Sequence, residues 1–346
     1  MSPTRTRPDE RLREEAGRPA DGLSRRASDD RLREEAGRPA DGFPGGRAPM
    51  TFDLGAYMKE RVAAVDAALE RFLPAETEPP ETLHKAMRYS LFAGGKRLRP
   101  VLVIAGAEAV GGRMDDVMPT ACALELIHTY SLVHDDLPAM DDDDFRRGAP
   151  TNHKMFGEAM AILAGDALLT LAFRLVADNV GPGMDAARLR DVLADIADAA
   201  GHAGMVGGQV ADLLSEGRRV SADAVDYIHA HKTGALIRTA LRVGARLSGA
   251  TPAQISALSV AGAALGLAFQ IIDDVLDVVS SSSVLGKTAG KDQAQNKATY
   301  PAIHGLEASR ARARHLIGEA EEALAELGPR AEPIRALGRF ILERRA

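Results

Sequence analysis

Two clusters of aspartates are the residues of this sequence best suited to chemistry. The first lies in "SLVHDDLPAMDDDDFRRG", residues 131–148, and the second in "QIIDDVLD", residues 270–277. Both follow apolar, helix-like segments, and a carboxylate beside a buried helix needs a counter-charge or a metal ion because burying an unpaired charge is costly. An acidic surface loop would explain either cluster alone. Two such clusters in one chain favour a site that binds divalent cations.

The second cluster fits one face of a helix. Asp273 and Asp277 are separated by about 40° around a helix, so their carboxylates lie one turn apart on the same side. Asp274 lies beside them. This spacing predicts a claw of two carboxylates, with a third acid adjacent to it.

The first cluster needs a different backbone, because Asp135 and Asp141 are six residues apart and would fall on different faces of a regular helix. Pro138 disfavours helical conformation at the residue before it. We therefore predict that the helix ends here and that the chain loops to bring Asp141 back beside Asp135.

The ligand chemistry of both clusters indicates Mg²⁺. Carboxylate oxygens with no neighbouring cage of Cys or His suit this ion, which keeps several waters and is usually completed by the phosphates of a substrate. The predicted metal ligands are Asp135, Asp136, Asp141, Asp273, Asp274 and Asp277.

Cationic side chains accompany the acidic clusters. Arginine forks and lysine point charges are the usual means by which proteins hold diphosphates. The candidates are Lys96, Arg97 and Arg99 in "GGKRLRP", Arg146 and Arg147 after the first acids, and Lys232 and Lys287 in glycine-flanked segments. The pattern predicts that one diphosphate is clamped through Mg²⁺ while another is bound directly by Arg and Lys.

The elements that must position these residues are helices. The chain is 45% hydrophobic with only 4% aromatic residues and no Trp, and apolar helical patterns alternate with Gly/Pro punctuation. This predicts an all-α fold, a single large bundle of about ten or more helices. The polar segment "SSSSVLGKTAGKDQAQNKATYP", residues 280–301, is predicted to be a lid over the site.

The first 49 residues have a different character from the rest of the chain. "RLREEAGRPADG" occurs at 11–22 and again at 31–42, and its few apolar residues predict a disordered, dispensable extension. The domain itself is predicted to span 50–346.

Composition excludes several other classes of protein. A net charge of −6 and the lack of a basic stripe interleaved with aromatics argue against nucleic-acid binding. Cys122 is the only cysteine, so no intrachain disulfide can form. The longest apolar run is too short to span a bilayer, and the N-terminus has no apolar signal-peptide core. We expect a cytoplasmic protein without stable membrane insertion.

The motifs, taken in order, resemble a known family. "GGKRLRP", "HTYSLVHDDLPAMDDDDFRRGAPTNH", "GMVGGQVADL", "HKTGAL", "GLAFQIIDDVLDV" and "LGKTAGKDQAQNKATYPA" are similar to those of short-chain trans-prenyltransferases, most of all the bacterial farnesyl diphosphate synthases. The resemblance covers residues 52–345. It implies an isoprenoid-synthase bundle around a central cavity, a homodimer, and three Mg²⁺ ions per site.

The resemblance also implies roles for individual residues. Asp135, Asp141 and Asp273 would ligate Mg²⁺, with the other three acids in support. Contacts to the diphosphate of the allylic substrate would come from Arg146, Lys232 and Lys287. Isopentenyl diphosphate would be bound by Lys96, Arg99, His128 and Arg147. The dipoles that face the carbocation would belong to Thr233, Gln270 and the backbone of Lys232.

The implied reaction is ionisation of dimethylallyl or geranyl diphosphate, attack by the double bond of isopentenyl diphosphate, and loss of a proton. Tyr130 lies five residues before Asp135, about one and a half helical turns back, where its ring would form the floor of the cavity for the growing chain. With the Pro138–Ala139 insertion, this favours (2E,6E)-farnesyl diphosphate as the product. Geranylgeranyl diphosphate is the alternative.

Three further kinds of protein would also account for the acidic motifs. A class I terpene cyclase uses a similar acidic helix, although it would need an aromatic-lined pocket. The second kind is a phosphohydrolase built on His134–Asp135, and the third is a non-catalytic partner subunit. Taken singly, the polar residues are compatible with ordinary structural roles: packing or capping for His128, His134 and Tyr130, and hydrogen bonds for Gln209, Asp212 and Gln270.

Overall fold

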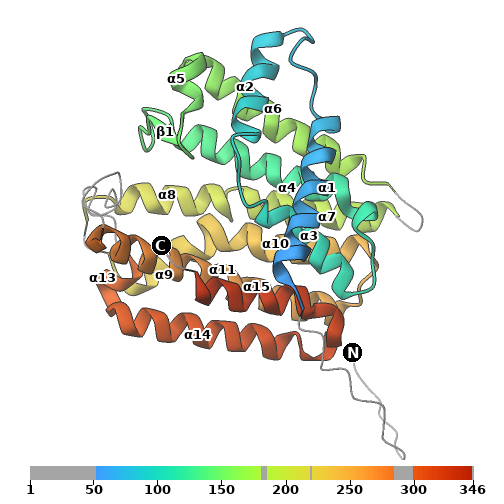
Figure 1. The fold of residues 1–346 in the computed structure, drawn as a ribbon, viewed down its shortest axis with the longest axis vertical. Helices are drawn as coiled ribbons and strands as arrows, with labels where there is room; N and C mark the ends of the chain where they lie inside the picture. The colour runs from blue at the N-terminus through green and yellow to red at the C-terminus, as the bar shows by residue number, and fades with distance from the viewer. Residues whose placement is uncertain (1–51, 181–184, 219, 284–298, 345–346) are drawn as a thin grey trace, which may run out of the picture. The chain divides into compact units, whose positions relative to one another are not determined.

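A computed structural model describes residues 52–180, 185–218, 220–283 and 299–344 of the chain (Figure 1). The predicted extension of residues 1–49, most of the predicted lid and Lys287 lie outside these ranges. In chain order the elements are α1 (Leu54–Phe72), α2 (Glu81–Leu91), α3 (Leu98–Ala109), α4 (Met114–Asp135), β1 (Phe145–Arg146), β2 (Ala149–Pro150), α5 (Asn152–Phe156), α6 (Glu158–Ala177), α7 (Ala186–Ala200), α8 (Met205–Ser215), α9 (Ala222–Ile228), the π-helical turn η1 (His229–Gly234), α10 (Ala235–Leu247), α11 (Pro252–Ser283), α13 (Tyr300–His304), α14 (Leu306–Ala323), the 3₁₀ turn η2 (Ala325–Ala331) and α15 (Glu332–Glu343).

The predicted all-α bundle is confirmed, with one small exception in the described residues. Strands β1 and β2 form an antiparallel pair directly after the first acidic cluster. Arg147 (φ 54°) and Gly148 (φ 78°) both have left-handed backbone conformations, and two such residues give the turn that suits a tight hairpin. The sequence did not indicate this hairpin because an arginine rarely adopts that conformation.

Helix α4 is the central helix that carries the first acidic cluster at its C-terminal end. Most of its residues between Val117 and Val133 are buried, as expected for a helix that is apolar around most of its circumference. It packs on α3 and α6. Leu124 and Leu126 are fully buried, so truncating either to alanine would cost about 2–5 kcal/mol. The helix is thereby a rigid support for the acids at its end.

Two glycines let the backbones of α3 and α10 approach closely. A Cβ atom on Gly106 would lie 2.3 Å from the carbonyl oxygen of Leu241, and one on Gly244 would lie 1.9 Å from that of Val103. No side chain fits at such distances in a close-packed interior. The crossing therefore depends on both glycines.

The two acidic clusters come from helices on either side of α10. Figure 1 shows α10 between α4 and α11, and it contacts both. The turn η1 leads into α10 and contacts α8 and α11. Lys232 and Thr233 of η1 are thus positioned between the helix that reaches the first cluster and the helix that carries the second.

Helix α6 and the first 28 residues of α11 are long and apolar enough to cross a membrane by length and composition. Both pack within the bundle, α6 on α4 and α11 on α10 and α14. Helices in the core of a large helical protein have the same composition. Their packing accounts for their apolarity.

Candidate active site

The first acidic cluster loops back as its proline predicts. Helix α4 ends at Asp135, and the backbone amide of Asp141 then donates a hydrogen bond of 2.9 Å to the carbonyl oxygen of Asp135. The amide of Asp142 donates to the carbonyl of Leu137 at 3.1 Å, which closes a second turn of the loop. The predicted return of Asp141 to Asp135 is confirmed.

The Asp136 carboxylate is bound to the hairpin. Its two oxygens accept hydrogen bonds of 2.7 and 3.0 Å from Arg146 Nε, and Arg146 Nη2 lies 2.6 Å from one of them. Asp136 is buried, and burial raises the pKa of its carboxyl while Arg146 opposes that rise. The pair therefore connects the end of α4 to β1. In this structure the Arg146 guanidinium is bound to the Asp136 carboxylate.

Asp135 is held by two other elements. The side-chain amide of Gln209, on α8, donates a hydrogen bond to it. Lys232 Nζ lies 3.9 Å from Asp135 Oδ2 and donates a hydrogen bond of 2.7 Å to Asp212 Oδ2. Gln209 and Asp212 thus form hydrogen bonds to other elements, as an ordinary structural role would have it. Their partners, however, are the predicted site residues Asp135 and Lys232.

The position of Lys232 depends on an irregular turn. Lys232 and Thr233 lie in η1, where the helix widens to π geometry, a feature that often occurs at functional sites. A Cβ on Gly208 would lie 2.2 Å from the backbone nitrogen of Lys232. Only glycine allows α8 to approach η1 so closely.

The second acidic cluster lies on α11, facing the C-terminal end of the described chain. Arg344 Nη1 donates a hydrogen bond of 2.5 Å to Asp273, and its guanidinium lies 4.8 Å above the ring of Phe269. Burial raises the pKa of the Asp273 carboxyl, and Arg344 opposes that rise. Asp277, one turn later, is exposed.

Asp274 lies differently from the position expected for it. Its Oδ2 accepts a hydrogen bond of 2.8 Å from the backbone amide of Tyr300 and lies 3.4 Å from His229 Nε2. The carboxylate is buried. Successive residues of a helix point about 100° apart, so Asp274 faces α13 and η1 instead of joining Asp273. Its hydrogen bond to the Tyr300 amide anchors α13, and its supporting role at the metal site stays a prediction.

A separate cationic pocket of about 540 Å³ lies at the start of α3. It brings together the four side chains that the family resemblance grouped, Lys96, Arg99, His128 and Arg147. Arg147 donates to the carbonyl oxygen of Gly94. A Cβ on Gly95 (φ 141°) would lie only 2.9 Å from Arg147 Nη1, so the lack of a side chain at Gly95 leaves room for the guanidinium.

The charges of this pocket are only partly neutralised. Arg99 Nε is buried and has no hydrogen-bond partner among the described residues. Burial lowers the pKa of Arg99, and the like charge of Arg147 adds to that effect although Glu125 opposes it. Burial and the same two arginines hold the pKa of His128 well below its ordinary range, so this imidazole is neutral. Such a pocket favours an anion.

Arg97, within the same motif, has a different partner set. Its guanidinium donates hydrogen bonds of 2.8 Å to Asp66 and 2.9 Å to Glu125. Its backbone adopts a left-handed conformation with φ 47°. These ion pairs fix the loop before α3. They leave Lys96 and Arg99 on either side of Arg97 to line the pocket.

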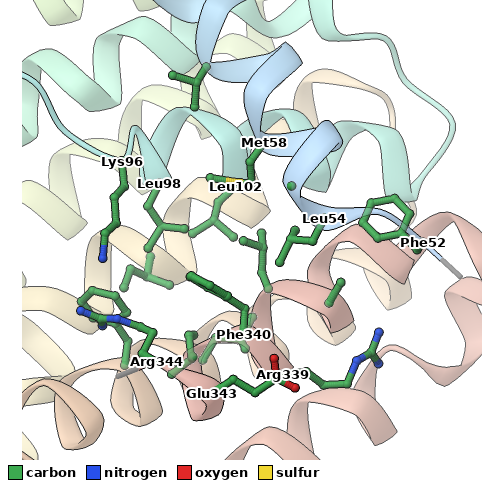
Figure 2. Close-up of a pocket in the computed structure, with 18 of the residues that line it drawn as sticks. Phe52, Leu54, Met58, Lys96, Leu98, Leu102, Arg339, Phe340, Glu343 and Arg344 are labelled. Atoms are coloured by element: carbon green, nitrogen blue, oxygen red, sulfur yellow. The ribbon is translucent and has the colours of Figure 1, made fainter. Parts of the chain in front are cut away.

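An apolar pocket of about 650 Å³ adjoins the cationic one and shares Lys96, Leu98 and Phe269 with it. Figure 2 shows Lys96 and Arg344 on one side of it and Phe52 on the other. Its walls come from α1, α3, α10, α11 and α15.

The comparisons with known proteins decide the family. The model named "Polyprenyl synthetase" matches residues 80–329. The chain belongs to the polyprenyl synthetase family. It is 50% identical over 295 residues to a dimethylallyltranstransferase of Fischerella ambigua, covering 85% of this chain and 84% of the relative. It is 48% identical to a chloroplastic geranylgeranyl pyrophosphate synthase of Catharanthus roseus over 85% of this chain and 82% of the relative.

The solved structures agree with this family. The structure of geranylgeranyl pyrophosphate synthetase from Pyrococcus horikoshii matches with a TM-score of 0.77 and 34% identity, covering 84% of this chain and 98% of that one. The chain therefore has the isoprenoid synthase fold, as predicted. It is a prenyltransferase of a family that elongates prenyl chains with isopentenyl diphosphate.

The remaining predicted residues lie as follows in this family member. Gln270 precedes Asp273 by one turn on α11 and is half-buried. Tyr130 is 7% exposed, belongs to the hydrophobic core and meets the His134 ring edge-on at 5.8 Å. His134 itself, on α4, contacts the carbonyl oxygen of Ile162 in α6 at 3.0 Å, so it links these two helices. Sequence reasoning missed Glu125 and His229, because their partners are distant in sequence.

Proposed function

We propose that the chain condenses isopentenyl diphosphate with an allylic prenyl diphosphate inside this bundle. The observation that carries the proposal is the pairing of two carboxylate clusters with a separate pocket of partly unneutralised cations. The clusters suit a diphosphate bridged by metal ions, and the pocket suits one bound without metal. A reaction that joins two diphosphate substrates needs both kinds of site.

Mg²⁺ fits the donor set of the clusters. Asp135 and Asp141 are two carboxylate residues whose backbones the loop joins, and Asp273 is a further one on α11. All three residues offer hard oxygen ligands, which Mg²⁺ prefers to the sulfur of Cys or the nitrogen of His. When bound, the ions would neutralise the leaving diphosphate and so favour ionisation of the allylic substrate. Asp277 would assist through water.

The chain's own cations complete the hold on the allylic diphosphate. Lys232 lies between Asp135 and Asp212 and would turn to the substrate as a third partner. Arg146 would add charge from the hairpin. Thr233 and Gln270 would direct their dipoles at the carbocation, and water must be kept out because it would quench that cation. No protein nucleophile is required.

The second substrate would be held in the cationic pocket. Lys96, Arg99 and Arg147 would bind the diphosphate of isopentenyl diphosphate, and neutral His128 would donate one hydrogen bond to it. Fixing this diphosphate positions the double bond for attack, which converts a bimolecular encounter into an oriented one. The proton released afterwards would pass to the departing diphosphate.

Two end products are proposed, and different observations favour them. Most of the related proteins of similar identity are named geranylgeranyl diphosphate synthases. Their names support a twenty-carbon product better than the fifteen-carbon product predicted from the sequence. The fifteen-carbon product rests instead on the sequence prediction that Tyr130, buried on α4, is the floor of the cavity, because a bulky side chain there shortens the space for the tail.

One assay tests the activity and separates the products. Purified protein with Mg²⁺ is incubated with isopentenyl diphosphate and dimethylallyl diphosphate, and the products are resolved by chromatography with mass detection. A dominant twenty-carbon diphosphate supports the relatives, and a dominant fifteen-carbon diphosphate supports Tyr130. If no condensation occurs while phosphate is released, the phosphohydrolase alternative replaces both. If neither occurs, the partner-subunit alternative does.

A further inference from the structure

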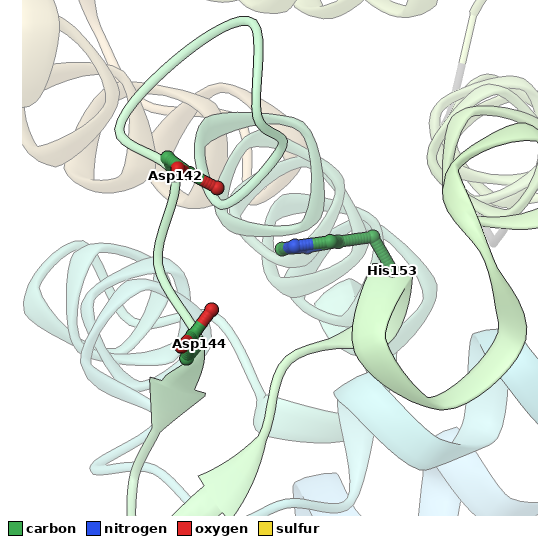
Figure 3. A group of neighbouring side chains, drawn as sticks. All are labelled: Asp142, Asp144 and His153. Atoms are coloured by element: carbon green, nitrogen blue, oxygen red, sulfur yellow. The ribbon is translucent and has the colours of Figure 1, made fainter.

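Three side chains gather beside the first acidic cluster without a part in the proposed reaction. Asp142 and Asp144 lie in the loop between α4 and β1, and His153 lies on α5. One ligand atom from each lies within 4.8 Å of the others. Figure 3 shows the His153 imidazole pointing toward the loop segment that carries both carboxylates. Acidic surface residues often cluster without a ligand, so the histidine decides what this group can do.

The hydrogen bonds of His153 fix its tautomer. The Thr151 hydroxyl donates its single hydrogen to the carbonyl oxygen of Asp143 at 2.7 Å. Its contact of 3.1 Å with His153 Nδ1 must then have Nδ1 as the donor, because a hydroxyl has only one hydrogen. A neutral imidazole with its proton on Nδ1 carries a lone pair on Nε2.

That lone pair has no hydrogen-bond partner. His153 is only 6% exposed, and its Nε2 is buried and unpartnered among the described residues. A buried acceptor left unsatisfied costs about 1–3 kcal/mol. Histidines that bind metals have this arrangement, with one nitrogen on the ion and the other donating to a fixed acceptor that holds the ring in place. Here the Thr151 hydroxyl is that acceptor.

We propose that Asp142, Asp144 and His153 form a binding site for a first-row transition-metal dication, with Zn²⁺ the best match. An imidazole nitrogen and two carboxylates are a donor set that Zn²⁺ accepts with one position left for water. Imidazole favours such an ion over Mg²⁺. The site is therefore chemically distinct from the carboxylate clusters.

The surroundings allow a cation to enter. Both carboxylates are exposed, so the ion reaches them from solvent. Lys154 Nζ lies 2.6 Å from one oxygen of Asp144 and competes with the metal. Lys154 is itself largely exposed, and an ion pair at such a surface contributes little stability. The metal would tie the loop that follows Asp141 to α5.

The test uses the full-length protein and Co²⁺ as a visible probe for the Zn²⁺ site. Co²⁺ is titrated in excess Mg²⁺, which occupies the oxygen-only ligands by mass action, and the absorption of the bound ion is recorded. We expect one equivalent of Co²⁺ with an imidazole-ligated spectrum. Asp142→Asn and His153→Ala should each weaken binding at least about tenfold, whereas Lys154→Ala should tighten it.

The control is Glu158→Gln, which removes a nearby exposed carboxylate outside the group and should leave Co²⁺ binding unchanged. Because His153→Ala opens a buried space, circular dichroism checks its fold, and Asp142→Asn tests the site at an exposed position. Zn²⁺ should also raise the Tm of the wild type but not of Asp142→Asn. Equal affinity and spectrum in wild type and Asp142→Asn would assign the metal elsewhere and overturn the proposal, as would a wild type that binds no Co²⁺ in excess Mg²⁺.

Discussion

The backbone amide of Asp141 donates a hydrogen bond of 2.9 Å to the carbonyl oxygen of Asp135. This contact converts a six-residue separation in sequence into a closed loop, so that two carboxylates from one motif can serve one site. The backbone makes this bond, and neither carboxylate takes part in it.

Replacing Asp141 by asparagine should therefore keep the loop and remove a ligand. We expect kcat/KM to fall by at least about 100-fold, with an unchanged circular dichroism spectrum and a higher Mg²⁺ requirement. The measurement is product formation against Mg²⁺ concentration. Asp115→Asn, an exposed acid in the first turn of α4, is the control. Activity of Asp141→Asn within twofold of wild type would remove this residue from the metal site.

The contact between Arg344 and Asp273 predicts a pH effect. Burial raises the pKa of Asp273 and Arg344 opposes the rise, so losing Arg344 raises the pKa further. The ionised carboxylate is the competent form, and activity is lost as the pH falls through that pKa. The acid limb of the kcat/KM profile should thus move to higher pH in Arg344→Gln. Arg339→Gln, which removes an arginine paired with Glu321 and Glu332, should leave the limb in place. A coincident profile for Arg344→Gln would contradict the prediction.

The buried Nε of Arg99 predicts that removing this charge weakens substrate binding without lowering stability. Arg99→Met should raise KM for isopentenyl diphosphate by roughly 10- to 100-fold, since a charge-assisted hydrogen bond contributes about 1.5–3 kcal/mol. KM for the allylic substrate should change little. Because the variant loses a partly neutralised charge, its unfolding free energy should stay level or increase. Steady-state kinetics and urea unfolding measure the two effects, with exposed Arg113→Met as control. Equal increases in both KM values would count against a separate acceptor site.

The ring of Tyr130 predicts a limit on product length. Tyr130→Ala should shift the main product to a longer prenyl chain by at least one five-carbon unit, because the proposed function makes this ring the floor of the cavity. Tyr130→Phe keeps the ring and should keep the wild-type product. Mass detection of the products distinguishes these outcomes, and an unchanged spectrum in Tyr130→Ala would exclude this side chain as the floor.

Asn179 predicts a stability effect remote from the site. Helix α4 contains Pro119. The Asn179 side chain accepts a hydrogen bond of 3.1 Å from the Thr120 amide and donates one of 2.8 Å to the Asp116 carbonyl. Asn179→Ala should leave these buried groups unpaired and lower the unfolding free energy by about 1–3 kcal/mol. Urea unfolding measures the loss. The neighbouring surface change Asp178→Ala should alter stability by less than about 0.5 kcal/mol, and an equal effect of both would refute the bridging role.

The first acidic loop was predicted from the sequence, and the hairpin after it was not. Pro138 and the helical pattern before it were sufficient to predict the return of Asp141, because both act within a few residues. The hairpin that follows escaped prediction, because Arg147 adopts a left-handed conformation that only its contacts with Gly94 and the surrounding fold can support.

The sequence by itself determined the chemistry of this protein: hard oxygen ligands on helices, separate cationic motifs, and helices to carry them. Residue types and near-neighbour spacing encode these properties directly. Only the tertiary structure decided the partners. Arg344 pairs with Asp273 from 71 residues away, while Asp274 turns to Tyr300 and His153 is left with an unpaired nitrogen among the described residues. Such contacts depend on how helices distant in sequence pack, and no local pattern records that packing.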